Sequence, residues 1–548
     1  MGGRLQVIRR VLRNPSLRRV ELAFLGFGAA EFGVWVAVLV FAYQHGGTGM
    51  AAAIAALQLG PAALLAPAAA ELADRRGREV TLAASYWLQA LALLGTGIVF
   101  LLGGAPAIGY AWATLAASAV TLTRPAQSAL VPRLVRTPSE LTAANVTSGW
   151  VESASMLLGP AAAGGLISLD GAGLAVVAFG ALMLVCALVA GGLNRVAARG
   201  GLLDTHEALR AEARPPRVGL LDLCVGERPV AVLLGVFFIQ FVALGSLDVL
   251  VVVLAVKQFA LGSGGAGYLE SMFGAGAVLG GFVAVALVGH RRLATPLLIA
   301  AAIWGGSLLV MAGWRAAGVA FVALVVVGAS RTVFDVAGRT ILHRAVPPHV
   351  HARIFGVVEG LEMAGLAVGS LSVPVLVAIG GTRAALIGIG AALMLGSVAA
   401  VAALGRIGDG LAVAGELIAL VRRGPLFAML GPPVIEDLAR GLVAVALAPG
   451  EVVVSEGKRG ERYFLVADGE LRVTIGGEEV RRLRQADGFG EIALLRDGIR
   501  TATVTAVSPA TVYALGRAPF LEALGASRHA RSAAETLVTE RVGPVPAA

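Results

Sequence analysis

The first 405 or so residues consist of long apolar runs separated by short polar turns. Each run is long enough, at about 20 residues, to cross the hydrocarbon core of a membrane as a helix. Gly and Ala are abundant within the runs, as close helix packing in lipid favours. The pattern therefore predicts a mainly α membrane protein whose spans lie near 20–43, 49–71, 80–103, 107–131, 141–168, 171–193, 229–256, 265–288, 295–313, 316–338, 352–378 and 382–405.

These twelve runs form two sets of six, and a polar pattern repeats between the sets. Residues 149–156 read GWVESASM and residues 356–363 read GVVEGLEM, so that Gly, Val, Glu and Met keep the same spacing. An acidic residue in the middle of an apolar span costs about 2.5–3.5 kcal/mol on insertion scales. Two such residues at matched positions indicate a duplicated six-helix unit.

After Arg406 the sequence becomes that of a soluble domain. Short strand-like runs with turn signals between them predict a small antiparallel β jelly roll with flanking helices near 424–442 and from residue 518 onward. The expected strands are 451–455, 463–467, 471–475, 479–483, 501–507 and 511–515. The predicted organisation is a first six-helix half over 1–194, a central loop over 195–228, a second half over 229–406, an amphipathic connector over 407–423 and the soluble domain over 424–548.

Composition and charge agree with a membrane location. The chain is 57% hydrophobic and 14% charged, with a mean hydropathy of +0.82, which excludes an ordinary soluble globular protein. Arginines crowd the N-terminal tail and every second loop, so the positive-inside rule predicts a multi-pass protein of the inner (plasma) membrane with both termini in the cytoplasm. The net charge of +9 thus reflects topology, and we expect no nucleic-acid partner. Two cysteines predict neither a disulfide framework nor a metal site.

The turn between the second and third spans carries a recognisable motif. Residues 71–78 read ELADRRGR, and they resemble the Gly-x-Leu-Ala-Asp-Arg-x-Gly-Arg signature of the major facilitator superfamily, with Ala70 in place of the first Gly. That family has a twelve-helix bundle built from a parallel repeat of six plus six. The resemblance implies that Asp74, Gly77 and Arg78 form a gating loop that latches one access state.

Two further segments resemble exporters of that superfamily. Residues 124–145 are similar to the branch that includes siderophore and multidrug exporters. Residues 159–165, GPAAAGG, loosely resemble an exporter motif, although Pro and Gly pairs also simply kink membrane helices. The resemblance favours export over import.

Acidic residues interrupt four of the apolar spans and are candidates for transport or coupling. They are Glu31, Glu152, Asp248 and Glu359. Such residues should face the bundle interior, where desolvation favours proton uptake. We expect proton coupling or recognition of a cationic substrate, and the alternative is a structural ion pair between spans. Glu270 and Glu362 are further candidates.

The soluble domain contains the run FGEIALLRDGIRTATV at residues 489–504. It resembles the phosphate-binding cassette of cyclic-nucleotide-binding domains, with Ile499 where the family has Pro. Gly490 lets the backbone approach a ligand, and Glu491, Ile492 and Ala493 open a short turn that aims N–H groups at a phosphate. The resemblance implies that Glu491 accepts from a ribose hydroxyl, that Arg500 neutralises the cyclic phosphate and that Thr501 and Ala502 complete the site. The final helix, near 529–541, would cover the base.

These features together predict a secondary active transporter for proton-coupled efflux of a small molecule, regulated by cAMP or cGMP bound to its tail. The alternative is a membrane-anchored cyclic-nucleotide receptor with little or no transport. The chain lacks a selectivity-filter run and a phosphate loop, which disfavours a channel and a primary pump. No hydrolytic pair lies near the cassette, so we expect no enzyme, a nucleotide that stays intact and no other cofactor.

Overall fold

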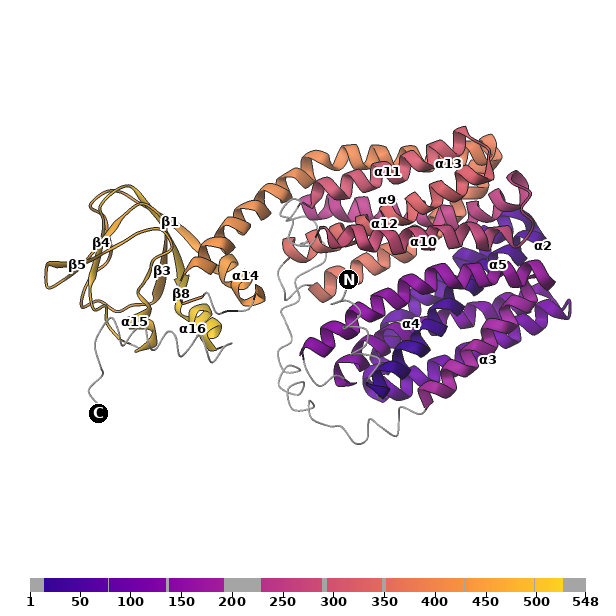
Figure 1. Cartoon of the computed structure of the whole chain (residues 1–548), viewed down its shortest axis with the longest axis horizontal. Helices are drawn as coiled ribbons and strands as arrows, with labels where there is room; N and C mark the ends of the chain where they lie inside the picture. Colours follow the sequence, from indigo (N-terminus) through magenta and orange to yellow (C-terminus); the bar gives the residue numbers. More distant parts are fainter. Residues whose placement is uncertain are drawn as a thin grey trace. The chain divides into compact units, whose positions relative to one another are not determined.

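The computed structural model describes residues 14–76, 78–134, 138–191, 228–287, 293–346, 351–424, 426–427, 430, 432–496 and 498–525. The chain divides into two compact units, Met1–Ile407 and Gly408–Ala548. The first unit is helical, and the second contains all of the described strands (Figure 1).

Ten helical elements form the first unit in the described part of the chain. They are α2 (Pro15–Arg76), α3 (Arg78–Leu101), α4 (Pro106–Leu134), α5 (Pro138–Gly191), α9 (Arg228–Val253), the π-helix η1 (Leu254–Gln258), α10 (Gly265–Val285), α11 (Ala294–Gly313), α12 (Ala317–Ala345) and α13 (His351–Arg423). Eight stretches within them are long and apolar enough to cross a membrane, judged by length and composition.

Three of these helices are interrupted by a pair of non-helical residues. The pairs are Gly46-Gly47 in α2, Asp170-Gly171 in α5 and Gly380-Gly381 in α13. In each pair the first residue has an extended φ between −149° and −156°, and the second has a φ between +64° and +77°, which favours glycine. Each pair divides its helix into two legs, which explains why three of the apolar stretches reach 45 to 48 residues.

Glycines let α10 approach two neighbouring helices at backbone distance. A Cβ at Gly267 would collide with the Pro160 carbonyl of α5, and a Cβ at Gly276 would collide with the Val325 carbonyl of α12. Glycine at these contacts lets the helix backbones approach more closely than larger side chains would allow. The aromatic pair Trp150–Phe282, with ring centroids 4.8 Å apart, continues the α5–α10 contact.

The second unit is a sandwich of two four-stranded antiparallel sheets with strand orders β1-β8-β3-β6 and β2-β7-β4-β5. The strands are β1 (Val443–Leu447), β2 (Val452–Val454), β3 (Arg462–Asp468), β4 (Leu471–Ile475), β5 (Glu478–Leu483), β6 (Gly488–Phe489), β7 (Thr503–Ala506) and β8 (Ala510–Gly516). The helices are α14 (Pro432–Gly441), α15 (Glu491–Leu495) and α16 (Arg517–Gly525).

Two apolar cores hold this unit together. One lies between the sheets and includes Phe464, stacked on Phe489 at 5.0 Å. The other lies under the helices, where Tyr463 stacks on Phe520 at 5.0 Å and Val421 of α13 joins the cluster. The last turns of α13 are therefore part of the sandwich unit.

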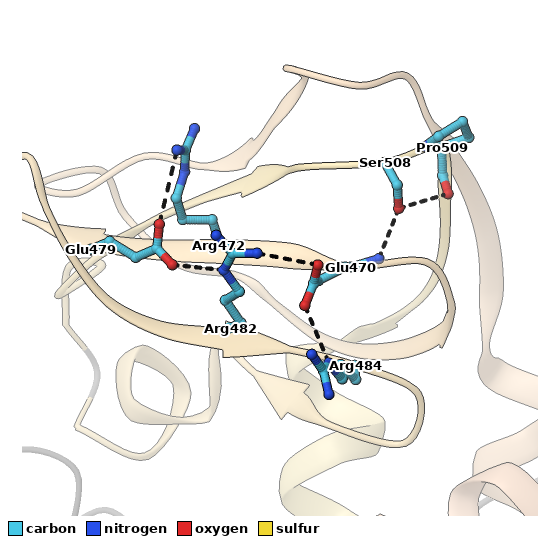
Figure 2. A network of polar contacts seen from close by, with 7 residues as sticks. All are labelled: Glu470, Arg472, Glu479, Arg482, Arg484, Ser508 and Pro509. Atoms are coloured by element: carbon cyan, nitrogen blue, oxygen red, sulfur yellow. Dashed lines mark hydrogen bonds and ion pairs between the residues drawn. The ribbon is translucent and has the colours of Figure 1, made fainter.

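Exposed ion pairs connect the β4–β5 hairpin to neighbouring turns (Figure 2). Glu470 accepts from Arg484 Nε at 3.2 Å and from Arg482 Nη1 at 3.4 Å, while its backbone N–H donates to Ser508. Arg482 also donates to Glu479 at 2.8 Å. Exposed pairs contribute only about 0–1 kcal/mol each, so the apolar cores dominate the stability of this unit.

The predicted β sandwich is confirmed, but two of its strands were missed. β1 follows the helix α14 after one residue and has little polar alternation, so we expected helix up to residue 442 and no strand after it. β6 has only two residues, too few for a strand pattern to be visible. The predicted connector over 407–423 is part of the helix α13.

The turn between β3 and β4 provides a test of this packing. Gly469 has a φ of +87°, and a Cβ there would lie 2.6 Å from both Ala510 Cβ and Pro509 O. We expect Gly469→Ala to lower the free energy of unfolding by about 2–4 kcal/mol, from left-handed strain and overpacking together. Denaturant unfolding of the 408–548 fragment, followed by circular dichroism, measures this.

Gly477→Ala is the matched control, because Gly477 has a φ of +89° but no atom within 4 Å of its Cβ position. We expect Gly477→Ala to lower the free energy of unfolding by only about 1–2 kcal/mol, which is the left-handed strain alone. Equal losses for both variants would contradict the packing at Gly469.

Candidate functional site

The most buried cation described in the second unit is Arg500, whose residue is 7% exposed. Its Nη1 donates to the Gly490 carbonyl at 3.0 Å, and its Nη2 donates to the Arg462 carbonyl at 2.7 Å. The Arg500 backbone N–H donates to the Lys458 carbonyl at 2.7 Å. A carbonyl directly after β6 and a carbonyl at the start of β3 thus fix this guanidinium, which also lies 5.8 Å from the centre of the Phe464 ring.

Two glycines make room for the guanidinium. A Cβ at Gly460 would lie 2.7 Å from Arg500 Nε and 2.6 Å from Ala493 Cβ. A Cβ at Gly490 would collide with Arg500 Nη1, and Gly490 has a φ of +93°. Larger residues at either position would displace Arg500.

Gly490 is directly followed by the single turn of helix α15. Glu491, its first residue, is 1% exposed, and Ala493 is also buried, whereas Ile492 is half-buried. Burial lowers the pKa of the Arg500 guanidinium from its ordinary value, and the nearby Glu491 carboxylate opposes this shift. Arginine remains charged at neutral pH despite such a shift, because its ordinary pKa lies far above neutrality.

The residues after Arg500 lie at the edge of this site. Thr501 is exposed, Ala502 is half-buried, and Ile499 is 61% exposed. The structure therefore brings Gly490, Glu491 and Arg500 together around one buried positive charge. The predicted helix near 529–541 lies outside the described residues.

The part of the chain that holds this buried arginine matches a known family. Residues 444–527 match the cyclic nucleotide-binding domain family. The match confirms the domain type that the 489–504 cassette predicts.

Similar proteins match this same part of the chain. A cAMP-dependent protein kinase regulatory subunit from Yarrowia lipolytica is 42% identical over 103 residues, which are 18% of this chain and 28% of that protein. A cGMP-dependent protein kinase from Eimeria tenella is 35% identical over 103 residues, or 19% of this chain and 10% of that protein. The chain thus spans less than a third of the length of these curated relatives.

A solved structure shows the same partial coverage. The regulatory domain of Toxoplasma gondii PKA with cAMP has 30% identity and a TM-score of 0.21, and the alignment covers 23% of this chain and 50% of that one. For residues 1–406 the resemblance to the major facilitator superfamily stays a prediction.

In the first unit, Arg124 of α4 joins two of the predicted acids. Its Nη2 donates to Glu31 Oε2 on α2 at 2.8 Å, and its Nη1 donates to Glu152 Oε1 on α5 at 2.9 Å. The side chain of Glu31 is 22% exposed and that of Glu152 is 45% exposed. One guanidinium thus connects three helices.

The second half of this unit has similar ion pairs on α12 and α13. Arg339 lies 4.0 Å from Glu359 and 3.7 Å from Glu362. The Glu359 side chain is 60% exposed, so this predicted acid is less enclosed than we expected, whereas that of Glu362 is 18% exposed.

Asp248 of α9 lies in a different environment. It forms a side-chain hydrogen bond with Trp35 of α2 and lies near Arg331, which pairs with Asp335 at 3.6 Å. Glu270 of α10 lies near Asp248. The acids of the second half therefore gather around two arginines, Arg331 and Arg339, and both Asp335 and Glu362 lie near the two.

The predicted gating loop is only partly described. Asp74 lies in α2, and Arg78 is the first residue of α3, but the side chains of both lie outside the described part. Gly77 lies outside the described residues altogether. A gating role for these three residues stays a prediction.

The sequence did not lead us to the basic partners of these acids, nor to Glu21. Arg124 and Arg331 interrupt the predicted spans as visibly as the acids do, and Arg339 directly follows one of these spans. Any ionisable residue in such a span, basic or acidic, is expected to pair with a polar or oppositely charged group. The same rule applied to arginines identifies Arg124 and Arg331.

The Arg124 bridge predicts a specific pattern of stability. Arg124→Gln should lower the free energy of unfolding of the full-length protein by about 2–3 kcal/mol, and with it the melting temperature. The reason is that two carboxylates lose their shared counter-ion. The double variant Arg124→Gln/Glu31→Gln should recover part of the loss. A thermal-shift assay in nanodiscs measures both, and purely additive losses in a double-mutant cycle would argue against the bridge.

Proposed function

We propose that this protein is a secondary active transporter of the major facilitator type, located in the inner (plasma) membrane and regulated by a cyclic nucleotide. Counting each interrupted helix as two legs gives six legs in α2–α5 and six in α9–α13, among the described residues. The interruptions in α5 and α13 have nearly the same backbone angles. These features support a duplicated six-helix unit.

The observation that carries the transport proposal is an arginine on the fourth helix of each half that pairs with acids on the fifth. Arg124 pairs with Glu152, and Arg339 pairs with Glu359. Ion pairs inside apolar bundles are expensive and mark substrate or ion pathways. Their repetition on equivalent helices of the two halves favours a pathway between the halves over a simple anchor.

Proton coupling follows from the chemistry of the Arg124 bridge. A proton bound by Glu31 or Glu152 would neutralise that carboxylate and weaken its bond to Arg124, since charge-assisted hydrogen bonds are about twice as strong as neutral ones. Helices α2, α4 and α5 would then pack differently in the two protonation states. A difference of this kind couples proton binding to conformation.

The tail binds a cyclic nucleotide in this proposal. The family match and the buried Arg500 beside Glu491 support it, because a fixed guanidinium suits a cyclic phosphate and an acidic oxygen suits a ribose hydroxyl. The relatives named above are cAMP- and cGMP-dependent. The nucleotide shifts the transport cycle only by its difference in affinity between the states of the transporter.

Nucleotide binding is tested by Arg500→Lys. We expect calorimetry of the full-length protein with cAMP and cGMP to show affinity lowered at least ~10-fold, since a lysine has no planar fork to satisfy both backbone carbonyls and a phosphate. Arg484→Lys is the control, because Arg484 is 79% exposed in the Glu470 network and should bind normally. Unchanged affinity in Arg500→Lys would refute the assignment.

Transport is tested by substrate-dependent proton movement in proteoliposomes. Glu31→Gln and Asp248→Asn should lower it at least ~10-fold, because each removes a protonatable group that lies against an arginine. Asp170→Asn, at an exposed helix interruption, should leave it unchanged. Wild-type protein that binds nucleotide but moves neither proton nor substrate would instead be a membrane-anchored receptor.

A further inference from the structure

A cavity of about 330 Å³ lies in the first half of the bundle, between α2, α4 and α5. Ligand pockets usually begin at about 300 Å³, so its size suits a small organic molecule. Its described lining is Phe24, Arg124, Gln127, Val131, Ser148, Gly149 and Glu152. All of these residues belong to one half of the bundle, so the site does not depend on contact between the halves.

Two polar residues of this lining, Glu152 and Ser148, can offer hydrogen-bond acceptors to a ligand. Arg124 directs its two terminal amino groups to Glu31 and Glu152. Glu152 uses one oxygen for that bond, and its side chain is 45% exposed. A carboxylate accepts through both oxygens, so Glu152 can also accept from a ligand in the cavity.

Glu21 makes Ser148 an acceptor as well. Ser148 Oγ donates to Glu21 Oε1 at 2.6 Å, which leaves the lone pairs of the serine oxygen for a ligand. Glu21 is 3% exposed, and its Oε2 has no hydrogen-bond partner among the described residues. Buried polar atoms normally have a partner, so this second oxygen marks an incompletely satisfied site beside the cavity.

The charges around the cavity are unequal. Among the described residues, Glu21, Glu31 and Glu152 contribute three carboxyl groups in or beside the cavity, against the guanidinium of Arg124. Phe24 adds an aromatic ring to the lining, and aromatic faces attract cations. Acceptor oxygens, an excess of acids and an aromatic ring all suit a positively charged ligand that carries N–H groups.

We propose that this cavity binds a small organic cation with N–H donors and an apolar or aromatic body, and that such cations are the substrate class of the transporter. Glu152 and Ser148 contact the cation, and Glu21 is a positioning residue that acts through Ser148. The substrate part of this inference rests on the proposed transport function, whereas the binding part does not.

The test uses ethidium, an aromatic cation with amino groups, and the full-length protein in nanodiscs. Fluorescence titration should show saturable binding above that of empty nanodiscs, and the anionic dye fluorescein should not bind. Glu152→Gln should weaken ethidium binding about 10-fold or more, since it removes a charge at constant shape. Glu21→Gln should weaken it less.

Gly149→Leu tests the location of the site without changing charge. A Cβ at Gly149 meets no atom within 4 Å, so a leucine there enters the cavity and should abolish ethidium binding. Gly356→Leu is the control, because Gly356 occupies the matching repeat position and also has open space. Size-exclusion profiles and thermal shifts verify that both variants fold.

Several outcomes would overturn the proposal. They are no saturable ethidium binding to the wild type, full affinity in both Glu152→Gln and Gly149→Leu, or equal binding of fluorescein. Loss of binding in Gly356→Leu as well would also place the site elsewhere. Ethidium that binds as expected but is not moved across proteoliposomes would sustain the cavity and defeat only the substrate part of the inference, so the failure of binding and the failure of transport are distinguishable.

Discussion

The helical unit depends on neutralising ionised side chains among apolar helices. An isolated charge there is unfavourable by several kcal/mol, so each acid needs a basic partner or an enclosed polar space. Arg124 meets this requirement for Glu31 and Glu152 at once, and it thereby fixes three helices relative to one another. The cavity lined by Ser148 and Glu152 lies between these same three helices.

The buried arginine of the sandwich unit, Arg500, has different hydrogen-bond acceptors from Arg124. Arg124 faces two carboxylates, whereas the side chain of Arg500 donates to two neutral backbone carbonyls. Neutral acceptors satisfy the N–H groups without cancelling the charge, and Glu491 offsets it only in part. The same residue type therefore suits a cationic ligand nearby in one unit and an anionic ligand in the other.

The sequence was informative where the physical signal was local and repeated. The apolar runs predicted the long helices, and the 489–504 cassette predicted the domain type and the residues around Arg500. Strand β6 was not predictable, because its two residues form a strand only by pairing with Phe464 and Leu465. Arg124 lies 93 positions along the chain from Glu31 and 28 positions from Glu152. No pattern in the sequence indicates which acids a given arginine reaches over such distances.

The helix interruptions also restrict what one end of the bundle can present to its surroundings. At Gly46-Gly47, Asp170-Gly171 and Gly380-Gly381 the connection between two legs is only two residues long. A protease or an antibody needs several residues of accessible, extended chain, and such tight turns offer none. Digestion and epitope insertion at this end should therefore be confined to the longer turns, such as that around residues 259–264, where Ala260 and Gly262 leave the helical conformation.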